Sequence, residues 1–248
     1  MNRIAIVTGG GSGIGRSVAL ALAADGWTVV VAGRRREALD ETVGLAKGPG
    51  QIEAIATDVT DESSVDALFD ATVSRHGRID LLFNNAGINV SNVPLDELPI
   101  AELKSILDIN LLGSMLCARA AFRVMRKQEP QGGRIVNNGS ISASTPRPFS
   151  APYTATKHAI TGLTKSLALD GRAYNIAASQ IDIGNAATDM TQRMATGILQ
   201  ADGSRKIEPR MPVSEIGNAV VFIANLPAGT NVPFMTVMAT NMPLYGRG

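Results

Sequence analysis

The sequence predicts a single α/β domain: a doubly wound, mainly parallel seven-stranded sheet with helices on both faces. Short apolar runs alternate with helical patterns along all 248 residues, which is typical of a parallel sheet covered on both sides. A glycine-rich turn joins the first apolar run to the first helical pattern. No composition break, long linker or internal repeat divides the chain, so we expect one domain over residues 1–248.

The elements follow in a regular order. We expect strands at residues 3–8, 28–32, 52–57, 81–84, 134–138, 175–183 and 234–239. Helical patterns lie between them, at residues 16–24, 37–46, 63–76, 102–127, 153–172 and 214–224. Right-handed crossover connections between such strands produce the doubly wound arrangement of Rossmann-type domains.

The helical pattern 102–127 is apolar nearly all round, which indicates burial on more than one side. We therefore expect it to pack on the sheet and also on a partner subunit, in a homodimer or homotetramer. Asn110 lies in its middle and must find hydrogen-bond partners there. It is either a structural amide or the holder of a catalytic water.

Composition excludes several classes of function. The net charge of +1 gives no electrostatic basis for binding nucleic acid or an anionic membrane. We find no basic-then-apolar leader and no apolar run of membrane-spanning length, so a cytoplasmic protein is expected. Cys117 is the only cysteine, and His76 and His158 are the only histidines. No metal site is therefore predicted.

The turn after the first strand has the composition of a phosphate-binding site. Glycines lack the Cβ atom that would keep an anion away, and the helix N-terminus attracts negative charge. The spacing differs from the usual G-x-G-x-x-G, and an ordinary glycine-rich turn is the alternative. The residues that we expect to contact a cofactor here are Gly9, Ser12, Gly13, Ile14 and Gly15.

The second strand ends at Gly33, followed by Arg34 and Arg35. In a dinucleotide fold a carboxylate at this point binds the adenosine ribose of NAD. Gly33 supplies none, and the adjacent arginines, which include Arg36, could pair with the 2′-phosphate of NADP. We therefore expect NADP in preference to NAD, with a solvated basic patch as the alternative.

Two further strand ends carry polar residues. Asp58 could accept a hydrogen bond from the adenine amino group, with the Val59 backbone beside it, or it could belong to the cap region of the next helix. The fourth strand runs into Asn84, Asn85, Ala86 and Gly87, where ligands bind in open α/β sheets. For Asn84 alone a structural turn role is favoured.

Tyr153 and Lys157 are four residues apart on one helical pattern and so lie on one face. An ammonium near a phenol stabilises the phenolate and lowers its pKa, which makes Tyr153 a candidate acid/base. Ser140, at the end of a neighbouring strand, could hydrogen-bond a substrate oxygen.

Taken together, these motifs resemble the classical short-chain dehydrogenase/reductase family. The matching residues are Thr8-Gly9-x-x-x-Gly13-Ile14-Gly15, Asp58, Asn84-Asn85-Ala86-Gly87, Asn110, Ser140 and Tyr153-x-x-x-Lys157. The resemblance implies hydride exchange between a nicotinamide cofactor and a carbonyl or secondary alcohol. It implies that Tyr153 transfers the proton, Ser140 holds the oxygen, Lys157 contacts the nicotinamide ribose, and Asn110 holds a water.

Some positions depart from the family pattern. After the sixth strand, where the family usually has Pro-Gly, this chain has Asp182-Ile183-Gly184-Asn185, although the Ile183 backbone and the Thr188 hydroxyl can still face the nicotinamide. Ser12 stands where NADP-preferring members often carry a second basic residue, and the usual Asp-Gly-Gly near the last strand is absent.

The substrate side is less determined. We interpret residues 186–211 as a helical lid, with a surface loop as the alternative, and Gly197 and Gly203 as its hinges. Arg147 or Arg193 could meet an acidic substrate group, or could be solvated. One alternative function is a catalytically silent NADP-sensing regulatory protein on the same fold. A disfavoured one is a nucleotide-sugar epimerase or dehydratase, because those enzymes usually have a longer C-terminal substrate domain.

Overall fold

The computed structural model describes residues 3–245, so the expected domain limits at residues 1 and 248 lie outside the described part. Its centre is a parallel sheet of seven strands in the order β3-β2-β1-β4-β5-β6-β9. The strands are β1 (Ile4–Thr8), β2 (Thr28–Gly33), β3 (Gln51–Ala56), β4 (Leu81–Asn84), β5 (Gly133–Asn138), β6 (Ile176–Ile183) and β9 (Phe234–Val237). The order reverses between β1 and β4, which confirms the doubly wound topology.

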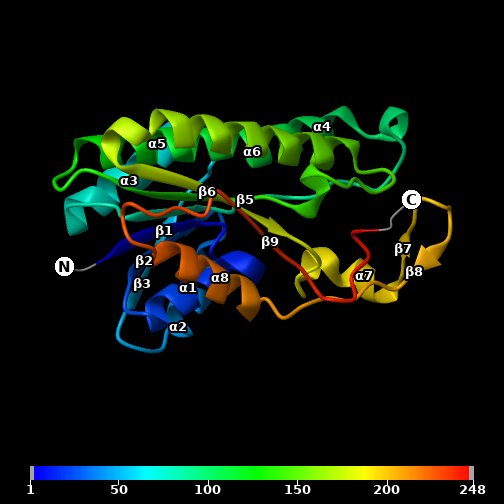
Figure 1. Ribbon diagram of the computed structural model, residues 1–248, viewed down its shortest axis with the longest axis horizontal. Helices are drawn as coiled ribbons and strands as arrows, with labels where there is room; N and C mark the ends of the chain where they lie inside the picture. The colour runs from blue at the N-terminus through cyan, green and yellow to red at the C-terminus, as the bar shows by residue number, and fades with distance from the viewer. Residues whose placement is uncertain (1–2, 246–248) are drawn as a thin grey trace.

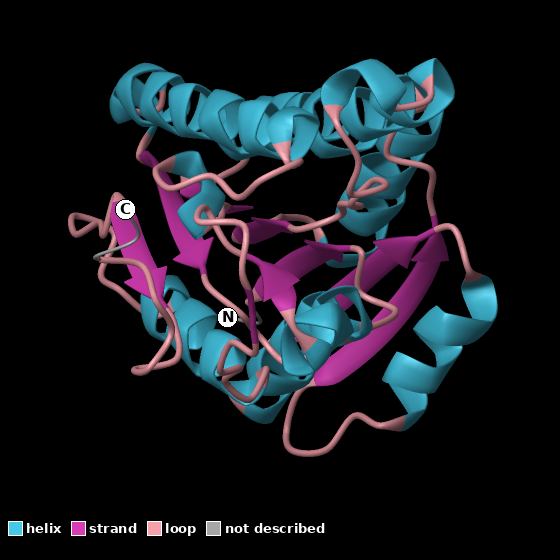
Figure 2. Cartoon of the chain, turned by 90° about the vertical axis from the view of Figure 1, so that its right-hand side faces the viewer, coloured by secondary structure: helices cyan, strands magenta, loops and turns pink. Residues whose placement is uncertain are grey.

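Helices cover both faces of the sheet (Figures 1 and 2). One layer contains α1 (Gly13–Ala24), α2 (Arg36–Gly44) and α8 (Ser214–Ala224). The other contains α3 (Glu62–His76), α4 (Ile100–Leu107), α5 (Gly113–Lys127) and α6 (Ala151–Asp170). The two layers follow from the crossover connections between parallel strands.

Alternate residues of the central strands enter two separate cores. Val7 and Val31 pack with Leu22 of α1 and Val220 of α8. The intervening residues, such as Ile6, pack on the opposite face with side chains of α3 and α5. Burial on both faces explains why these strands appear in the sequence as continuous apolar runs.

The helical pattern expected at residues 102–127 is interrupted. A π-helical turn at Asp108–Leu112 joins α4 to α5. The whole stretch Ile100–Lys127 is long and apolar enough to cross a membrane, contrary to the sequence expectation that no such run exists. Its buried residues, including Cys117, Ala121 and Met125, pack in the core under the sheet, as expected for a core helix.

Residues 186–211 extend beyond the two-layer body at the carboxyl end of the sheet (Figure 1). They contain α7 (Gln192–Thr196) and a small antiparallel pair, β7 (Ile198–Leu199) with β8 (Arg205–Lys206). The ends of the segment are joined, because Ala187 N donates to Met211 O at 2.8 Å. Gly197 and Gly203 have φ values of 115° and 81°, which glycine adopts readily.

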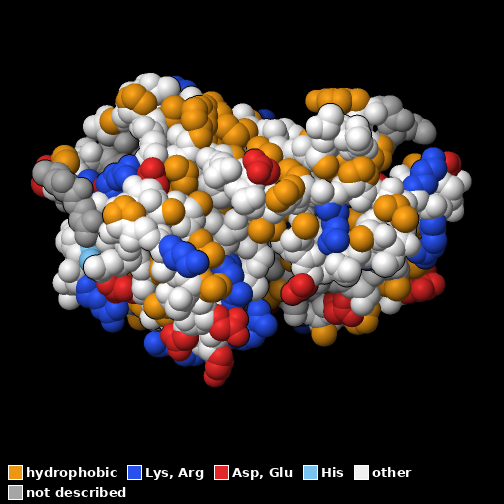
Figure 3. Space-filling model, turned by 90° about the horizontal axis from the view of Figure 1, so that it is seen from below, with side chains coloured by type: hydrophobic (Ala, Val, Ile, Leu, Met, Phe, Trp, Pro, Cys, Tyr) orange, Lys and Arg blue, Asp and Glu red, His pale blue; other side chains and the backbone are white. Residues whose placement is uncertain are grey.

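Charged side chains of both signs are interspersed on the face shown in Figure 3, with apolar side chains between them. That distribution agrees with the net charge of +1. It gives no continuous surface of one sign on this face.

Candidate functional site

A cavity of about 460 Å³ lies along the carboxyl ends of β1, β2, β4, β5 and β6. Every residue that the sequence nominated as catalytic or cofactor-binding lines it. These residues are Gly9, Ser12, Gly13, Ile14, Gly15, Gly33, Arg34, Arg35, Asp58, Val59, Asn85, Ala86, Gly87, Asn110, Ser140, Tyr153, Lys157, Ile183 and Thr188. Ligands bind at this edge in open parallel sheets.

The glycine turn has no room for side chains. Gly9 has φ +66°, and a Cβ there would lie 2.9 Å from Asn85 Nδ2. A Cβ on Gly15 would lie 2.2 Å from the Gly9 carbonyl oxygen. The first N–H groups of α1 have no helical acceptor, and the Ser12 side chain does not cap them. The turn therefore fits an anion such as a pyrophosphate.

The end of β2 is basic, as expected. Arg34 and Arg35 make no ion pair within residues 3–245, whereas Arg36 pairs with Asp40 at 2.8 Å. The charge of Arg34 contributes to lowering the pKa of Asp58, although the larger cause is the Thr60 backbone N–H that donates to this carboxylate. The unpaired arginines leave a positive region at the cavity wall.

Asp58 has a local structural partner as well as a place in the cavity. Its Oδ1 accepts from Thr60 N at 3.0 Å and from Thr60 Oγ1 at 2.8 Å. The cap of α3 is a different residue, Asp61, which accepts from Ser63 N. Both expected roles of Asp58 are therefore compatible.

A chain of hydrogen bonds connects β1 to Lys157. Thr8 Oγ1 accepts from Asn85 N at 2.9 Å, and Asn138 Nδ2 donates to Asn85 Oδ1 at 2.8 Å. Lys157 Nζ then donates to the Asn138 carbonyl at 2.7 Å. Asn84 instead donates to the Ser114 carbonyl beneath the sheet and does not line the cavity, in agreement with its favoured structural role.

Lys157 is buried and Tyr153 is half-buried, and their surroundings shift the pKa of both side chains. Burial raises the pKa of Tyr153, while a hydrogen bond with Ser140 and the charge of Arg193 lower it. Lys157 Nζ lies 5.6 Å from the ring centroid of Tyr153, and burial lowers its own pKa to about 8. The net direction for Tyr153 is thus opposite to the one expected from the spacing, because burial outweighs the favourable groups.

The carboxylate of Asp182, on the neighbouring strand β6, positions Ser140. Its backbone N–H donates to Asp182 Oδ1 at 3.0 Å, and its Oγ accepts from Ser142 N at 3.1 Å. The charge of Lys157 also acts on Asp182, whose pKa burial raises. The loop that presents Ser140 is therefore fixed from both sides.

Asn110 lies within the π-helical turn. Its side chain makes two hydrogen bonds to one residue: Oδ1 accepts from Ile88 N at 2.8 Å, and Nδ2 donates to Ile88 O at 2.9 Å. These bonds hold the segment that follows Gly87 against the helix. These contacts are those of a structural amide, and the catalytic role of Asn110 stays a prediction; π-helical turns are frequent at functional sites.

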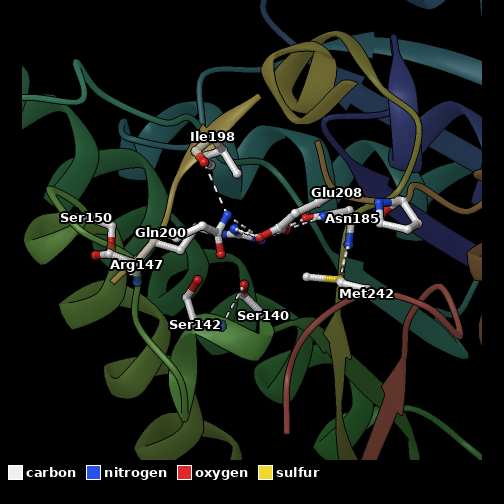
Figure 4. Close-up of polar contacts among 10 residues, drawn as sticks. Ser140, Ser142, Arg147, Ser150, Asn185, Ile198, Gln200, Glu208 and Met242 are labelled. Atoms are coloured by element: carbon white, nitrogen blue, oxygen red, sulfur yellow. Dashed lines mark hydrogen bonds and ion pairs between the residues drawn. The ribbon is translucent and has the colours of Figure 1, made fainter. Parts of the chain in front are cut away.

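A buried ion pair joins the loop after Ser140 to the 186–211 segment (Figure 4). Both Nη atoms of Arg147 donate to Glu208 carboxylate oxygens at 2.6 Å, and Asn185 Nδ2 donates to Glu208 Oε2 at 2.8 Å. Glu208 is 2% exposed. Hydrogen bonds from Arg147 and Asn185 outweigh burial and lower the pKa of Glu208 to about 2.

Comparison with known proteins identifies the family. Residues 3–198 match the family model described as short chain dehydrogenase. The chain belongs to the short-chain dehydrogenase family. It is an oxidoreductase of the group that acts on alcohols and carbonyls with a nicotinamide cofactor.

Several named relatives are similar to this chain over most of their length. The short-chain dehydrogenase anuF of Penicillium roqueforti is 36% identical, covering 91% of this chain and 90% of its own. The cis-4-hydroxycyclohexanecarboxylate dehydrogenase of Sinomonas cyclohexanicum is 34% identical, covering 90% and 89%. The structure of 3-ketoacyl-(acyl-carrier-protein) reductase from Brucella melitensis with NADH has a TM-score of 0.84 and 25% identity, covering 96% and 98%.

Three site residues were not found from the sequence. Asn138 and Asp182 end neighbouring strands, and only the β5–β6 pairing brings them beside Lys157 and Ser140. Glu208 had no motif around it. A polar residue at the carboxyl end of a parallel strand was the one available signal for the first two.

Proposed function

We propose that this protein is an NADP(H)-dependent oxidoreductase that interconverts a carbonyl and a secondary alcohol, with Tyr153 as the acid/base. The observation that carries this proposal is the arrangement of Tyr153, Ser140 and Lys157 on the wall of the cavity that the glycine turn also lines. The name of the Sinomonas relative, a hydroxycyclohexanecarboxylate dehydrogenase, supports an alcohol as one of the substrates.

The residues that line the cavity support a dinucleotide cofactor. A nicotinamide cofactor, when bound, supplies or accepts the hydride. The glycine turn would hold its pyrophosphate, and Asp58 with the Val59 backbone would face the adenine. Asn85, Ala86, Gly87, Ile183 and Thr188 line the remaining wall. Arg34 and Arg35, without acidic partners, support a 2′-phosphate and hence NADP in preference to NAD.

The protein residues handle the proton. During reduction Tyr153 donates its hydroxyl proton to the carbonyl oxygen, and during oxidation it accepts the proton of the alcohol. Ser140, hydrogen-bonded to Tyr153, orients that oxygen. Lys157 places positive charge 5.6 Å from the ring centroid of Tyr153 and would contact the nicotinamide ribose. The π-helical turn at Asn110 is where a water would connect Lys157 to solvent.

The 186–211 segment is proposed as the lid of this cavity. Thr188, Met190 and Met194 line the wall, and the methionines suit an adaptable apolar surface. The start of the segment lies close to the glycine turn, because a Cβ on Gly13 would be 3.2 Å from Thr188 Cγ2.

A cytoplasmic location remains our expectation.

Replacing Tyr153 with phenylalanine tests the proposal. The substitution removes the acid/base and keeps the ring, so turnover on a substrate found in a panel of carbonyls and alcohols should fall by about 100-fold or more. The affinity for NADPH, measured by fluorescence titration, should stay unchanged. Tyr174→Phe is the matched control, because Tyr174 packs against Phe122 outside the cavity.

Near-wild-type turnover by Tyr153→Phe would contradict the mechanism. Tight NADPH binding by a wild-type protein that turns over no member of the panel would favour the regulatory, cofactor-sensing alternative instead.

A further inference from the structure

Two arginines, Arg147 and Arg193, line the cavity on the side of Tyr153. Only one of them has an acidic partner. Arg147 is neutralised by the bidentate pair with Glu208. Arg193, on α7, makes no ion pair within the described residues 3–245. Within the described residues its guanidinium makes one hydrogen bond, a long one from Nη1 to Asn92 Oδ1 at 3.4 Å.

The Nε atom of Arg193 is buried and has no hydrogen-bond partner in the described chain. A buried donor that lacks an acceptor is destabilising. Burial and the nearby charge of Arg147 lower the pKa of Arg193, and Arg193 in turn lowers the pKa of Tyr153. The guanidinium of Arg193 therefore lines the cavity near Tyr153 and has no anionic partner within the described residues. A bound anion would supply one.

We propose that Arg193 binds a carboxylate of the substrate, so that the enzyme acts on hydroxy acids and the corresponding oxo acids. The inference rests on the function proposed above and adds the substrate class. With Nη1 turned toward Asn92, the Nε–Nη2 edge remains, and its two parallel N–H groups match the two oxygens of a carboxylate. In Arg147 the charge is already paired, because Nη1 and Nη2 donate to Glu208 and Nη2 also donates to Asn185 Oδ1 at 3.1 Å.

The position of Arg193 distinguishes a substrate carboxylate from the phosphates of the cofactor. Its charge acts on Tyr153, where the reacting oxygen must lie. Arg34 and Arg35 supply positive charge at the end of β2, and the glycine turn lies at the end of β1. Asp189 also lines the cavity and precedes Arg193 by one helical turn, but it makes no ion pair with it.

The test compares matched acids and esters in the wild type and in Arg193→Gln. Binding of α-, β- and γ-oxo acids and of their methyl esters is measured by calorimetry with oxidised cofactor present at saturation, and kcat/KM is measured for the same compounds with NADPH. We expect the wild type to prefer at least one acid over its ester by about tenfold or more. Arg193→Gln should lose that preference through KM, while any change in kcat that follows from its charge near Tyr153 should be the same for acid and ester.

Arg205→Gln is the matched control, because Arg205 is an exposed arginine of the same segment that does not line the cavity. It should keep the preference for the acid. A wild type that binds no acid more tightly than its ester overturns the inference. So does an Arg193→Gln variant that loses acid and ester equally, or one that loses NADPH affinity, which would place the guanidinium on the cofactor.

The two proposals fail in different ways. Turnover of neutral carbonyls without preference for acids would contradict the proposal that the substrates are hydroxy and oxo acids. It would still support the oxidoreductase function. Binding of an acid that depends on Arg193, without any turnover, would support the carboxylate site and contradict the proposed reaction.

Discussion

At the scale of single residues, the absence of a carboxylate at the end of β2 separates the two nicotinamide dinucleotides. Gly33 leaves the wall open, and Arg34 has no acidic partner that would compete for a phosphate. Arg34→Ala should therefore weaken NADPH binding by about tenfold and change NADH binding little, because a charge-assisted hydrogen bond to a phosphate is worth about 1.5–3 kcal/mol.

Fluorescence titration of both reduced cofactors measures this effect. Arg36→Ala is the control, since Arg36 already pairs with Asp40, and both affinities should stay at the wild-type level. Tighter binding of NADH than of NADPH by the wild type, unchanged in Arg34→Ala, would refute the preference for NADP.

Residue types and spacing were sufficient to nominate the cavity wall but not its electrostatics. Tyr153 and Lys157 could be placed on one helical face from their separation alone. The direction of the pKa of Tyr153 depends on burial, which local spacing does not describe. Lys157 is directed to the Asn138 carbonyl by the pairing of β5 with its neighbours, a tertiary contact that no motif contains.

At the scale of elements, the 186–211 segment is attached to the body by the Arg147–Glu208 pair. Glu208 titrates at about 2 in the fold against an ordinary value of 4.5, because hydrogen bonds stabilise its charged form. A lowered carboxylate pKa stabilises the fold above pH 4.5, and this stabilisation is lost as the pH falls toward 2. The Glu208 side chain is 1% exposed, so solvent screens it little. The difference between its two pKa values then corresponds to about 3 kcal/mol of folding free energy.

Glu208→Gln should therefore lower the free energy of unfolding by about 3 kcal/mol at pH 7. The gap between variant and wild type should narrow as the pH falls below 4.5. Urea denaturation at several pH values measures it, with Glu37→Gln, an exposed acid without an ion pair in the described chain, as control. Equal stability of Glu208→Gln and wild type at pH 7 would show that the pair does not anchor the segment.

The elements themselves differ in how well sequence patterns predict them. The central strands were predicted to within one or two residues, because burial on both faces leaves a continuous apolar run. The π-helical turn at Asp108–Leu112 was not predicted, since its residues fit an α-helical pattern equally well. The β7–β8 pair was missed because two-residue strands carry no periodic signal.

At the scale of the whole molecule, the apolar residues of α4, α5 and α6 exceed what the single chain can bury. Ile106, Cys117 and Met125 face the core, yet Leu112 and Met115 are 44% and 42% exposed, and Leu169 of α6 is 60% exposed. Such an exposed apolar surface indicates a contact with another protein. We propose that it is the homodimer contact expected from the sequence, within a dimer or tetramer.

Replacing Leu112 and Met115 together with glutamate should dissociate this oligomer. Two carboxylates on each side of a desolvated contact would be buried without partners, which costs several kcal/mol per charge. Light scattering at micromolar concentration should report an oligomer for the wild type and a monomer for the double variant. Leu45→Glu is the control, because Leu45 is equally exposed, at 48%, but follows α2 in the opposite helix layer. Circular dichroism should show the same helix content in all three proteins, since none of the substituted side chains belongs to either core. A monomeric wild type would contradict the assignment, and the apolar residues of α4 and α5 would then need another partner.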